Sequence, residues 1–309
     1  MKLFYRFFYS RFINVIYRNL MFPFRKLVPN FMRVPVTGVL TIKDAESGKQ
    51  LKFYSNESCP MVRHLYWNEE GFSFEFSPIF KQLITNCDTF VDIGANVGYY
   101  SLLGAVLEPK MTIFSFEPSV GPLWFLRRNV ALNNFANIQV VDSAVGNESG
   151  VISFFEERNL KYGYLEHHAS GIGNTINSWD IANFSKYDVT LISLDDFLKN
   201  HTSSKIDLIK MDTEGTENHV LAGAINTILE HQPIIICEVL NGKIEAEMDE
   251  LIHNQMKYDI YQFLNDECRL LKVPGLSSAT KLSNENSNFF FVPPSKQSLI
   301  QPFIKNPGA

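Results

Sequence analysis

The 309-residue sequence contains few cysteines, and none of them is close to another. Cys59, Cys87, Cys237 and Cys268 form no C-x-x-C pair. Disulfide frameworks of small secreted proteins and cysteine zinc sites both depend on closely spaced cysteines. The wide spacing therefore favours reduced thiols in a cytosolic compartment over a disulfide framework or a zinc site.

The sequence also lacks a long uninterrupted apolar run. The most apolar terminal stretch is "MKLFYRFFYSRFINVIYRNLMF", and its arginines recur too often for a helix that spans a membrane. No small-residue cleavage site of the kind that ends a signal peptide follows it. We therefore expect a cytoplasmic protein, and peripheral contact with the inner membrane face stays open.

Acidic residues are absent from the first part of the chain. Residues 1–33 carry seven lysines and arginines and no acid, a charge of +7. Subtracting this from the net charge of −5 leaves −12 for the remainder. An acidic body argues against a general nucleic-acid-binding protein.

The same terminal segment has the periodicity of an amphipathic helix. Polar residues recur every fourth position and form one stripe, which consists of Lys2, Arg6, Ser10, Asn14 and Arg18. Apolar residues form another side, which consists of Phe4, Phe8, Phe12, Val15 and Ile16. Two interpretations remain open: a helix packed on the main domain or on a second subunit, and an interfacial helix on an anionic membrane surface.

Beyond the arm, the patterns predict a hairpin and then a repeated βα rhythm. The hairpin has its turn at Asp44–Lys49. The expected strands are "TFVDI", "MTIFSFEP", "NIQVVDSAV", "IDLIKMD", "PIIICEV", "YDIYQFL" and "NFFFVP". The expected helices are Val97–Leu107, Val120–Asn133, Asn218–Leu229 and Glu245–Met256. The region around "VISFFEE" and "VTLIS" is expected to be irregular. This order predicts an α/β fold with a mostly parallel sheet and helices on both faces.

The stretch "VDIGANVGYYS", Val91–Ser101, lacks two familiar phosphate-binding motifs. A dinucleotide fingerprint requires G-x-G-x-x-G, but Asn96 and Tyr99 stand at two of the glycine positions. A P-loop requires a lysine after its last glycine, and none follows Gly98. Both absences disfavour NAD and ATP, and a nucleotide-dependent oxidoreductase with them.

S-adenosylmethionine is the remaining common ligand for this arrangement, and it contains no phosphate. Gly94 and Gly98 would let the backbone approach its amino-acid end. Glu117 follows the second strand, where a carboxylate accepts hydrogen bonds from ribose hydroxyls. The third strand ends where an adenine edge would lie. The predicted cofactor-binding residues are Asp92, Gly94, Asn96, Gly98, Glu117, Asp142, Ser143 and Ala144.

Two acidic residues follow the fourth strand in "KMDTEGTENH". Methyl transfer to a hydroxyl requires alignment of the reactants and benefits from a base that takes the hydroxyl proton. Asp212 is the first candidate for this role and Glu214 the second. The alternative for Asp212, a cap of the helix that begins near Thr216, stays open. No third ligand stands at a telling spacing, so no metal site is predicted.

With these residues identified, the chain resembles the FkbM-type family of S-adenosylmethionine-dependent methyltransferases. The blocks that carry the resemblance are "FVDIGANVGYYS", "FEPS", "NNFANIQVVDSAVGN", "LDDFL", "KIDLIKMDTEGTENHVLAGA" and "PIIICEV". The resemblance implies a seven-stranded Rossmann-like class I methyltransferase sheet whose last strand is antiparallel. It also implies methyl transfer to a hydroxyl oxygen, often of a sugar, lipid-linked or polyketide acceptor.

Four segments are therefore predicted: a basic aromatic arm (1–33), a β-hairpin extension (34–81), a methyltransferase domain (82–296) and a C-terminal tail (297–309). The predicted function is O-methylation of a sugar, glycan or glycolipid-type acceptor. The alternative is a non-catalytic membrane-surface or partner-binding protein that retains the fold. Neither the acceptor nor the oligomeric state follows from the sequence.

Overall fold

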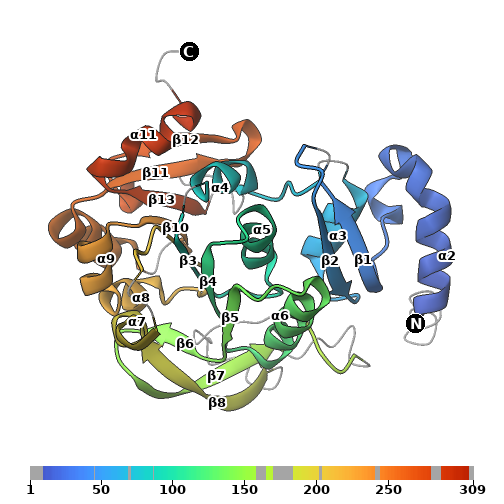
Figure 1. Ribbon diagram of the computed structural model, residues 1–309, viewed down its shortest axis with the longest axis horizontal. Helices are drawn as coiled ribbons and strands as arrows, with labels where there is room; N and C mark the ends of the chain where they lie inside the picture. Colours follow the sequence, from blue (N-terminus) through green and yellow to red (C-terminus); the bar gives the residue numbers. More distant parts are fainter. Residues whose placement is uncertain are drawn as a thin grey trace.

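The computed structural model describes residues 10–44, 46–68, 71–85, 87–157, 165–169, 184–201, 204–240, 244–279 and 287–305 (Figure 1). Its centre is an eight-stranded sheet with the order β12-β11-β13-β10-β9-β3-β4-β5. The strands are β3 (Thr89–Ile93), β4 (Thr112–Phe116), β5 (Ile138–Val141), β9 (Leu208–Met211), β10 (Ile234–Glu238), β11 (Asp259–Leu264), β12 (Arg269–Val273) and β13 (Asn288–Val292).

The order of the strands is that of a Rossmann-like class I methyltransferase sheet, as predicted. Strands β5, β4, β3, β9 and β10 are parallel, and the order along the sheet reverses between β3 and β9. Strand β13 is antiparallel to both of its neighbours, β10 and β11. Ligands of open α/β sheets bind beyond the carboxyl ends of the strands at such a reversal.

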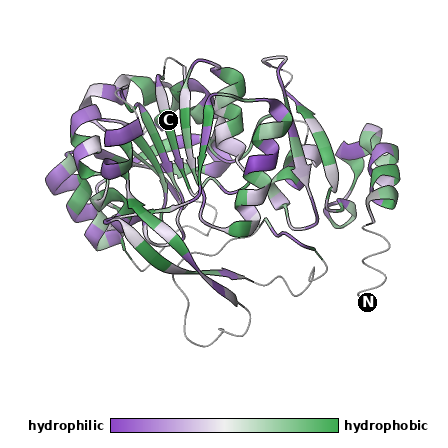
Figure 2. Cartoon of the chain, turned by 60° about the horizontal axis from the view of Figure 1, so that its bottom comes forward, coloured by the Kyte–Doolittle hydropathy of each residue, from purple (hydrophilic) through white to green (hydrophobic). Residues whose placement is uncertain are grey.

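Helices cover both faces of this sheet (Figure 1). They are α4 (Ser77–Leu83), α5 (Tyr99–Leu107), α6 (Val120–Asn133), α7 (Leu194–His201), α8 (Glu217–Ala222), α9 (Ile225–His231), α10 (Glu245–Glu250) and α11 (Gln297–Ile300). Helix α3 (Pro60–Trp67) lies instead beside the N-terminal hairpin. Successive residues of a strand point to opposite faces. Phe90 and Val91 are both fully buried and belong to two different core clusters, which explains why these strands read as continuous apolar runs (Figure 2).

Two details of the sheet and its helices differ from the prediction. The edge strand β12 was not expected, because its Arg269 is exposed and only part of the strand is buried. The helix expected over Asn218–Leu229 is divided into α8 and α9 near Gly223. A Cβ atom at Gly223 would lie 1.9 Å from the carbonyl oxygen of Gly146, so the backbones meet closely at this break.

The region expected to be irregular was wrongly predicted, because it forms a second sheet. This sheet has the order β6-β8-β7 and consists of β6 (Ala144–Gly146), β7 (Gly150–Glu157) and β8 (Phe184–Ser193). Strands β7 and β8 pair antiparallel from Gly150–Leu191 to Glu157–Phe184. The partners are far apart in the chain, and local patterns carry little information about such pairing.

The predicted hairpin is confirmed. Strands β1 (Gly38–Lys43) and β2 (Gln50–Ser55) pair antiparallel. Leu40, Ile42, Leu51 and Phe53 are buried in the same core cluster as Phe90 of the main sheet. The hairpin is therefore packed into the body of the protein.

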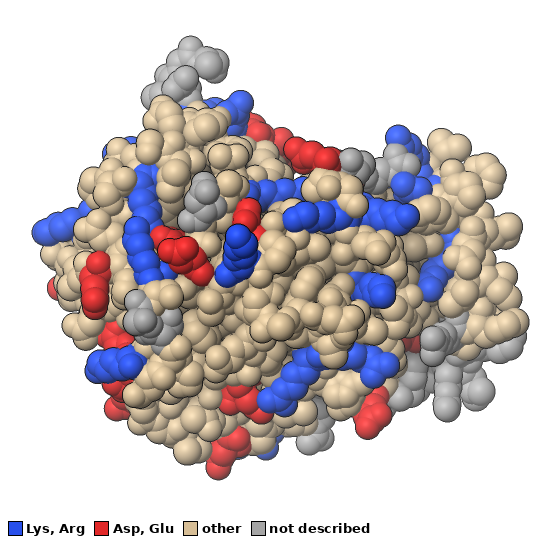
Figure 3. All heavy atoms as spheres, viewed as in Figure 1, with Lys and Arg blue, Asp and Glu red and all other residues tan. Residues whose placement is uncertain are grey.

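The arm precedes the hairpin, and its residues 1–9 lie outside the described residues. They include Lys2 and Arg6 of the predicted polar stripe and Phe4 and Phe8 of the predicted apolar side. The described part contains α2 (Arg11–Met21) and the 3₁₀ turns η1 (Phe22–Leu27) and η2 (Asn30–Met32). It lies at one end of the molecule (Figure 1), where the visible surface is largely uncharged (Figure 3). Among the described helices, none has the length and apolar character needed to cross a bilayer.

Candidate functional site

A cavity of about 270 Å³ lies beyond the carboxyl ends of β3, β4 and β9. The second sheet forms one of its walls through Ile152, Phe154 and Leu191. Most of the predicted site residues line this cavity: Gly94, Asn96, Glu117, Ser143, Ala144, Asp212 and Glu214. The fold thus brings together residues from four separate strand ends.

The turn after β3 requires glycine for internal packing. Gly94 has a φ of +70°, and a Cβ there would lie 2.0 Å from the carbonyl oxygen of Asp212. Gly98 has a φ of +91°, and a Cβ there would lie 2.5 Å from the side chain of Leu126. The expected reason for both glycines was the approach of a ligand, but the protein's own atoms occupy the space beside them.

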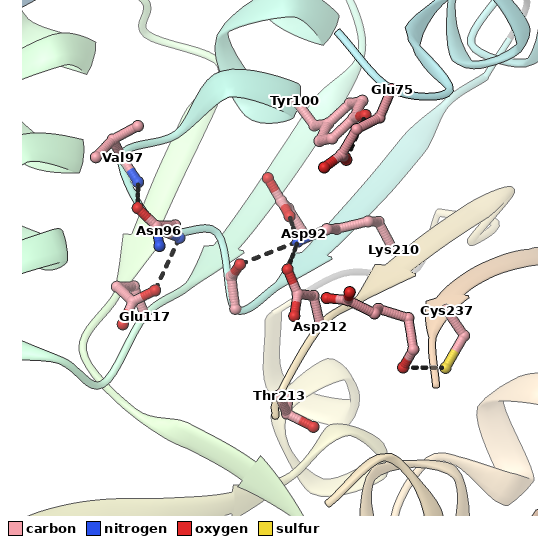
Figure 4. Close-up of polar contacts among 12 residues, drawn as sticks. Glu75, Asp92, Asn96, Val97, Tyr100, Glu117, Lys210, Asp212, Thr213 and Cys237 are labelled. Carbon is pink, nitrogen blue, oxygen red and sulfur yellow. Dashed lines mark hydrogen bonds and ion pairs between the residues drawn. The ribbon is translucent and has the colours of Figure 1, made fainter. Parts of the chain in front are cut away.

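Glu117 is held in a fixed orientation by two backbone amides. The amide of Asn96 donates to its Oε2 at 2.7 Å, and the amide of Ser119 donates to its Oε1 at 2.8 Å (Figure 4). Burial raises the pKa of Glu117 to about 7, although these hydrogen bonds favour the ionised form. The carboxylate therefore faces the cavity in one defined geometry.

A buried lysine connects β3 to the end of β9. Lys210 Nζ donates to the carbonyl oxygen of Gly94 at 3.0 Å, and it lies 3.8 Å from Asp92 Oδ1 and 3.5 Å from Asp212 Oδ2 (Figure 4). Burial by itself would lower the pKa of Lys210, but the carboxylates of Asp212 and Asp92 raise it overall. Lys210 therefore stays charged and fixes the position of Asp212.

Lys210 was not predicted as a site residue from the sequence. Its signal was a single charged residue inside the apolar strand "IDLIKMD". A charge in a buried strand is stable only with partners, and Asp92 and Asp212 supply them.

Asp92 lies beneath the cavity and does not line it. Its side chain is buried, and Ser101 Oγ donates to its Oδ2 at 2.6 Å. Burial raises the pKa of Asp92, against the opposing charge of Lys210. In this position Asp92 supports Lys210 from below the site.

Asp212 has a second acidic neighbour, Glu238, at the end of β10. Burial raises the pKa of Glu238 to about 8, and the charge of Asp212 and a hydrogen bond between the two side chains add to this. Ser287 Oγ donates to Glu238 Oε1 at 2.8 Å. The raised pKa favours the protonated form of Glu238 beside Asp212.

Asp212 does not cap α8, which has no side-chain hydrogen bond at its N-cap. Glu217 Oε1 accepts hydrogen bonds from the amide and hydroxyl of Thr213 and from the amide of Gly215. This network holds the turn before α8, whose N-cap residue is Thr216. The Asp212 carboxylate instead lines the cavity and faces Lys210.

The remaining predicted residues are divided between the cavity and the surface. Ser143 and Ala144 line the cavity, and so does the exposed Glu214. Asp142 faces outward, and its Oδ2 lies 3.2 Å from Arg127 Nη2. His219, which the sequence analysis did not select, also lines the cavity. Within the described ranges, no group of three or more His, Cys, Asp or Glu side chains is arranged to hold a metal ion.

Comparison with known proteins gives matches over the same part of the chain. Residues 92–268 match the family described as "Methyltransferase FkbM domain". The 31-O-demethyl-FK506 methyltransferase FkbM of Streptomyces tacrolimicus is 27% identical in a 154-residue alignment that covers 44% of this chain and 59% of that protein. Methyltransferase 1 of Beauveria bassiana is 28% identical in a 145-residue alignment that covers 44% of this chain and 58% of that protein.

A crystal structure of methyltransferase FkbM from Methylobacillus flagellatus is also similar. It has a TM-score of 0.42 and 17% identity, over 69% of this chain and 47% of that chain. The matched region of this chain spans about three fifths of the length of the two curated relatives. The family match covers more than half of the present chain, from β3 to the turn before β12. This protein therefore belongs to the FkbM methyltransferase domain family.

Proposed function

We propose that the protein is an S-adenosylmethionine-dependent methyltransferase that methylates a hydroxyl oxygen of a sugar, glycan or glycolipid-type acceptor. The observation that supports this most is the presence of Glu117 and Asp212 in one cavity. Each carboxylate is positioned by contacts within the protein, and each can accept further hydrogen bonds from a molecule bound in the cavity.

The first part of the cavity fits the cofactor. Each oxygen of an ionised carboxylate accepts two hydrogen bonds, and the two amides at Glu117 use only part of this capacity. Glu117 would therefore bind the ribose hydroxyls, with Gly94, Asn96, Ser143 and Ala144 around the rest of the cofactor. When bound, S-adenosylmethionine supplies an electrophilic methyl group on a sulfonium.

The second part of the cavity suits a hydroxyl acceptor. Asp212 and Glu214 accept hydrogen bonds from hydroxyl groups, and Asp212 would orient the reacting hydroxyl. Lys210 lies 3.5 Å from the Asp212 carboxylate, and Glu238, whose pKa is raised, is a further neighbour of it. The hydroxyl proton passes to the Asp212–Glu238 pair as the oxygen gains its new carbon bond.

The acceptor class is supported by the site chemistry and by one relative. Clustered carboxylates match the many hydroxyl donors of a sugar. The relative from Streptomyces tacrolimicus is named for the 31-O-demethyl form of its acceptor, a name that places the methyl group on oxygen. We infer oxygen as the target atom here as well.

Calorimetric titration with S-adenosylmethionine tests the cofactor part. Glu117→Ala should weaken binding by about 1–3 kcal/mol, because ribose hydroxyls would lose their acceptor. Glu230→Ala, on the exposed side of α9, is the matched control and should bind as the wild type does. Tight binding of NAD without binding of S-adenosylmethionine would overturn the proposal.

Transfer of a labelled methyl group to cell-envelope glycans and glycolipids tests the acceptor part. The label should be recovered in a methyl ether and should be lost in Asp212→Asn. Recovery on nitrogen or carbon would contradict the assignment of oxygen as the target atom.

A further inference from the structure

Helix α2 is turned so that its polar side faces the protein and its apolar side faces solvent. Asn14 is 1% exposed and Arg18 is 8% exposed. Phe12, on the other side of the helix, is 75% exposed, and Ile16 and Leu20 are exposed as well. Apolar residues of a surface helix usually face the core, so this helix has the opposite orientation.

Hydrogen bonds to the chain before β1 fix this orientation. Asn14 Nδ2 donates to the carbonyl oxygen of Pro35 at 2.7 Å, and its Oδ1 accepts from the amide of Thr37 at 3.2 Å. Arg18 Nη1 donates to the carbonyl oxygen of Thr37 at 2.8 Å. Rotating the helix to bury Phe12 would break these buried hydrogen bonds, so the apolar side stays outward.

The exposed apolar side continues into the two 3₁₀ turns that follow. Leu27 is 80% exposed and Phe31 is 87% exposed. We define the apolar arm surface as Phe12, Ile16, Leu20, Phe22, Phe24, Leu27 and Phe31, all exposed. Exposed large apolar side chains concentrated in one short segment indicate a surface that another partner covers.

We propose that the apolar arm surface docks on an anionic lipid membrane. Charge supports this partner, because residues 10–33 contain five basic residues and no acid. Arg18 is buried against the protein, but Arg25 is only partly buried and Lys26 is exposed, next to the apolar residues of η1. Anionic head groups attract such a segment, while the apolar side chains enter the interface. A second copy of the chain would instead bring two segments of like charge together.

The arm is held by hydrogen bonds to Pro35 and Thr37, directly before the hairpin, and the hairpin is hydrogen-bonded to the domain that contains the cavity. The amide of Tyr54 in β2 donates to Asn129 Oδ1 at 2.7 Å, and the amide of Lys52 donates to Asn133 Oδ1 at 2.8 Å. Both asparagines belong to α6, which begins directly after the Glu117 turn. Docking of the arm would therefore hold the cavity in a fixed orientation relative to the lipid surface.

Co-sedimentation of the full chain with vesicles tests this proposal without cofactor or acceptor, so its outcome is independent of the proposed function. The probes are vesicles of phosphatidylcholine alone and of phosphatidylcholine mixed with phosphatidylglycerol. The wild type should sediment only with the mixed vesicles, and added salt should weaken the binding. A protein that stays in the supernatant with both kinds of vesicle overturns the proposal.

Two sets of variants test whether residues of the arm are responsible for vesicle binding. The triple variant Phe24→Ser, Leu27→Ser and Phe31→Ser should bind the mixed vesicles at least tenfold more weakly. Its control carries Val151→Ser, Leu229→Ser and Leu299→Ser, which are exposed apolar positions elsewhere, and should bind normally. Lys26→Glu should weaken binding more than Lys110→Glu does. Equal losses in variants and controls contradict the proposal.

Sedimentation velocity tests the other candidate partner of the apolar arm surface, a second copy of the chain. We expect the wild type and the triple variant to have the same oligomeric state. A wild-type dimer that the triple variant converts to monomers would assign the apolar arm surface to self-association and overturn the membrane proposal.

Discussion

Glu117 should make cofactor binding depend on pH in a defined direction. Burial raises its pKa from 4.5 to about 7 in the ligand-free protein. Hydroxyl groups that donate to this carboxylate stabilise its ionised form, so the pKa of Glu117 should fall when the cofactor binds. Binding below about pH 7 must therefore release a proton, and affinity should rise as pH rises.

The magnitude follows from the ionised fraction of Glu117. A group with a pKa of about 7 is roughly nine tenths ionised at about pH 8 and roughly one tenth ionised at about pH 6. If only the ionised form binds well, the dissociation constant should be about tenfold larger at the lower pH. This ratio corresponds to about 1.4 kcal/mol.

Calorimetry between these two pH values, in buffers of different ionisation enthalpy, measures both the affinity and the released proton. Glu117→Gln is the matched control, because its amide has a similar shape and cannot ionise. Titration of the ligand itself contributes equally to both proteins, so the difference between them isolates Glu117. An identical pH dependence in wild type and Glu117→Gln would refute the reasoning.

Three further predictions concern the floor and the acceptor side of the cavity. Asp212→Asn should lower turnover at least about a hundredfold, which is the lower end of the range for loss of a general base. It should leave the affinity for the cofactor within about twofold of the wild type. Turnover at the wild-type rate in steady-state kinetics would show that Asp212 is not catalytic. Turnover should rise as pH increases through about 8, because Glu238, whose pKa is raised to about 8, then loses its proton and the Asp212–Glu238 pair becomes more basic. Glu238→Gln should abolish this rise. A pH–rate profile that is the same in Glu238→Gln and the wild type would contradict the prediction. Gly94→Ala should lower the free energy of unfolding by more than about 1 kcal/mol, because the added Cβ would meet the backbone of Asp212. Gly150→Ala is the control and should change the free energy of unfolding less, because Gly150 has open space beside it. Equal effects of the two variants in denaturant titration would argue against close packing at Gly94.

The sequence by itself determined the order of the main elements. Apolar runs that alternate with helical periodicity predicted the parallel sheet, because strands covered on both faces have no polar side. The polar residues after the first, second and fourth strands predicted a site at one edge, because parallel strands end on the same side. Glu117 and Asp212 do lie in one cavity.

The roles of Lys210 and Glu238 depended on the tertiary structure. Each is a single charged or acidic residue in an apolar strand. Lys210 in β9 meets Asp92 of β3 as well as the nearby Asp212, and Glu238 in β10 meets Asp212 at the end of β9. The second sheet was also decided by pairing between distant segments, β7 with β8. Local periodicity does not encode which distant segment a strand will meet.

Helix α2 shows most clearly the difference between what the sequence pattern predicts and what tertiary contacts decide. Its sequence defines one polar and one apolar side, and the usual preference would place the apolar side inward. The chain before β1 instead presents backbone groups that hydrogen-bond to Asn14 and Arg18. An unsatisfied buried backbone group is costly, so satisfying these groups fixed the polar side inward and left Phe12, Ile16 and Leu20 facing solvent.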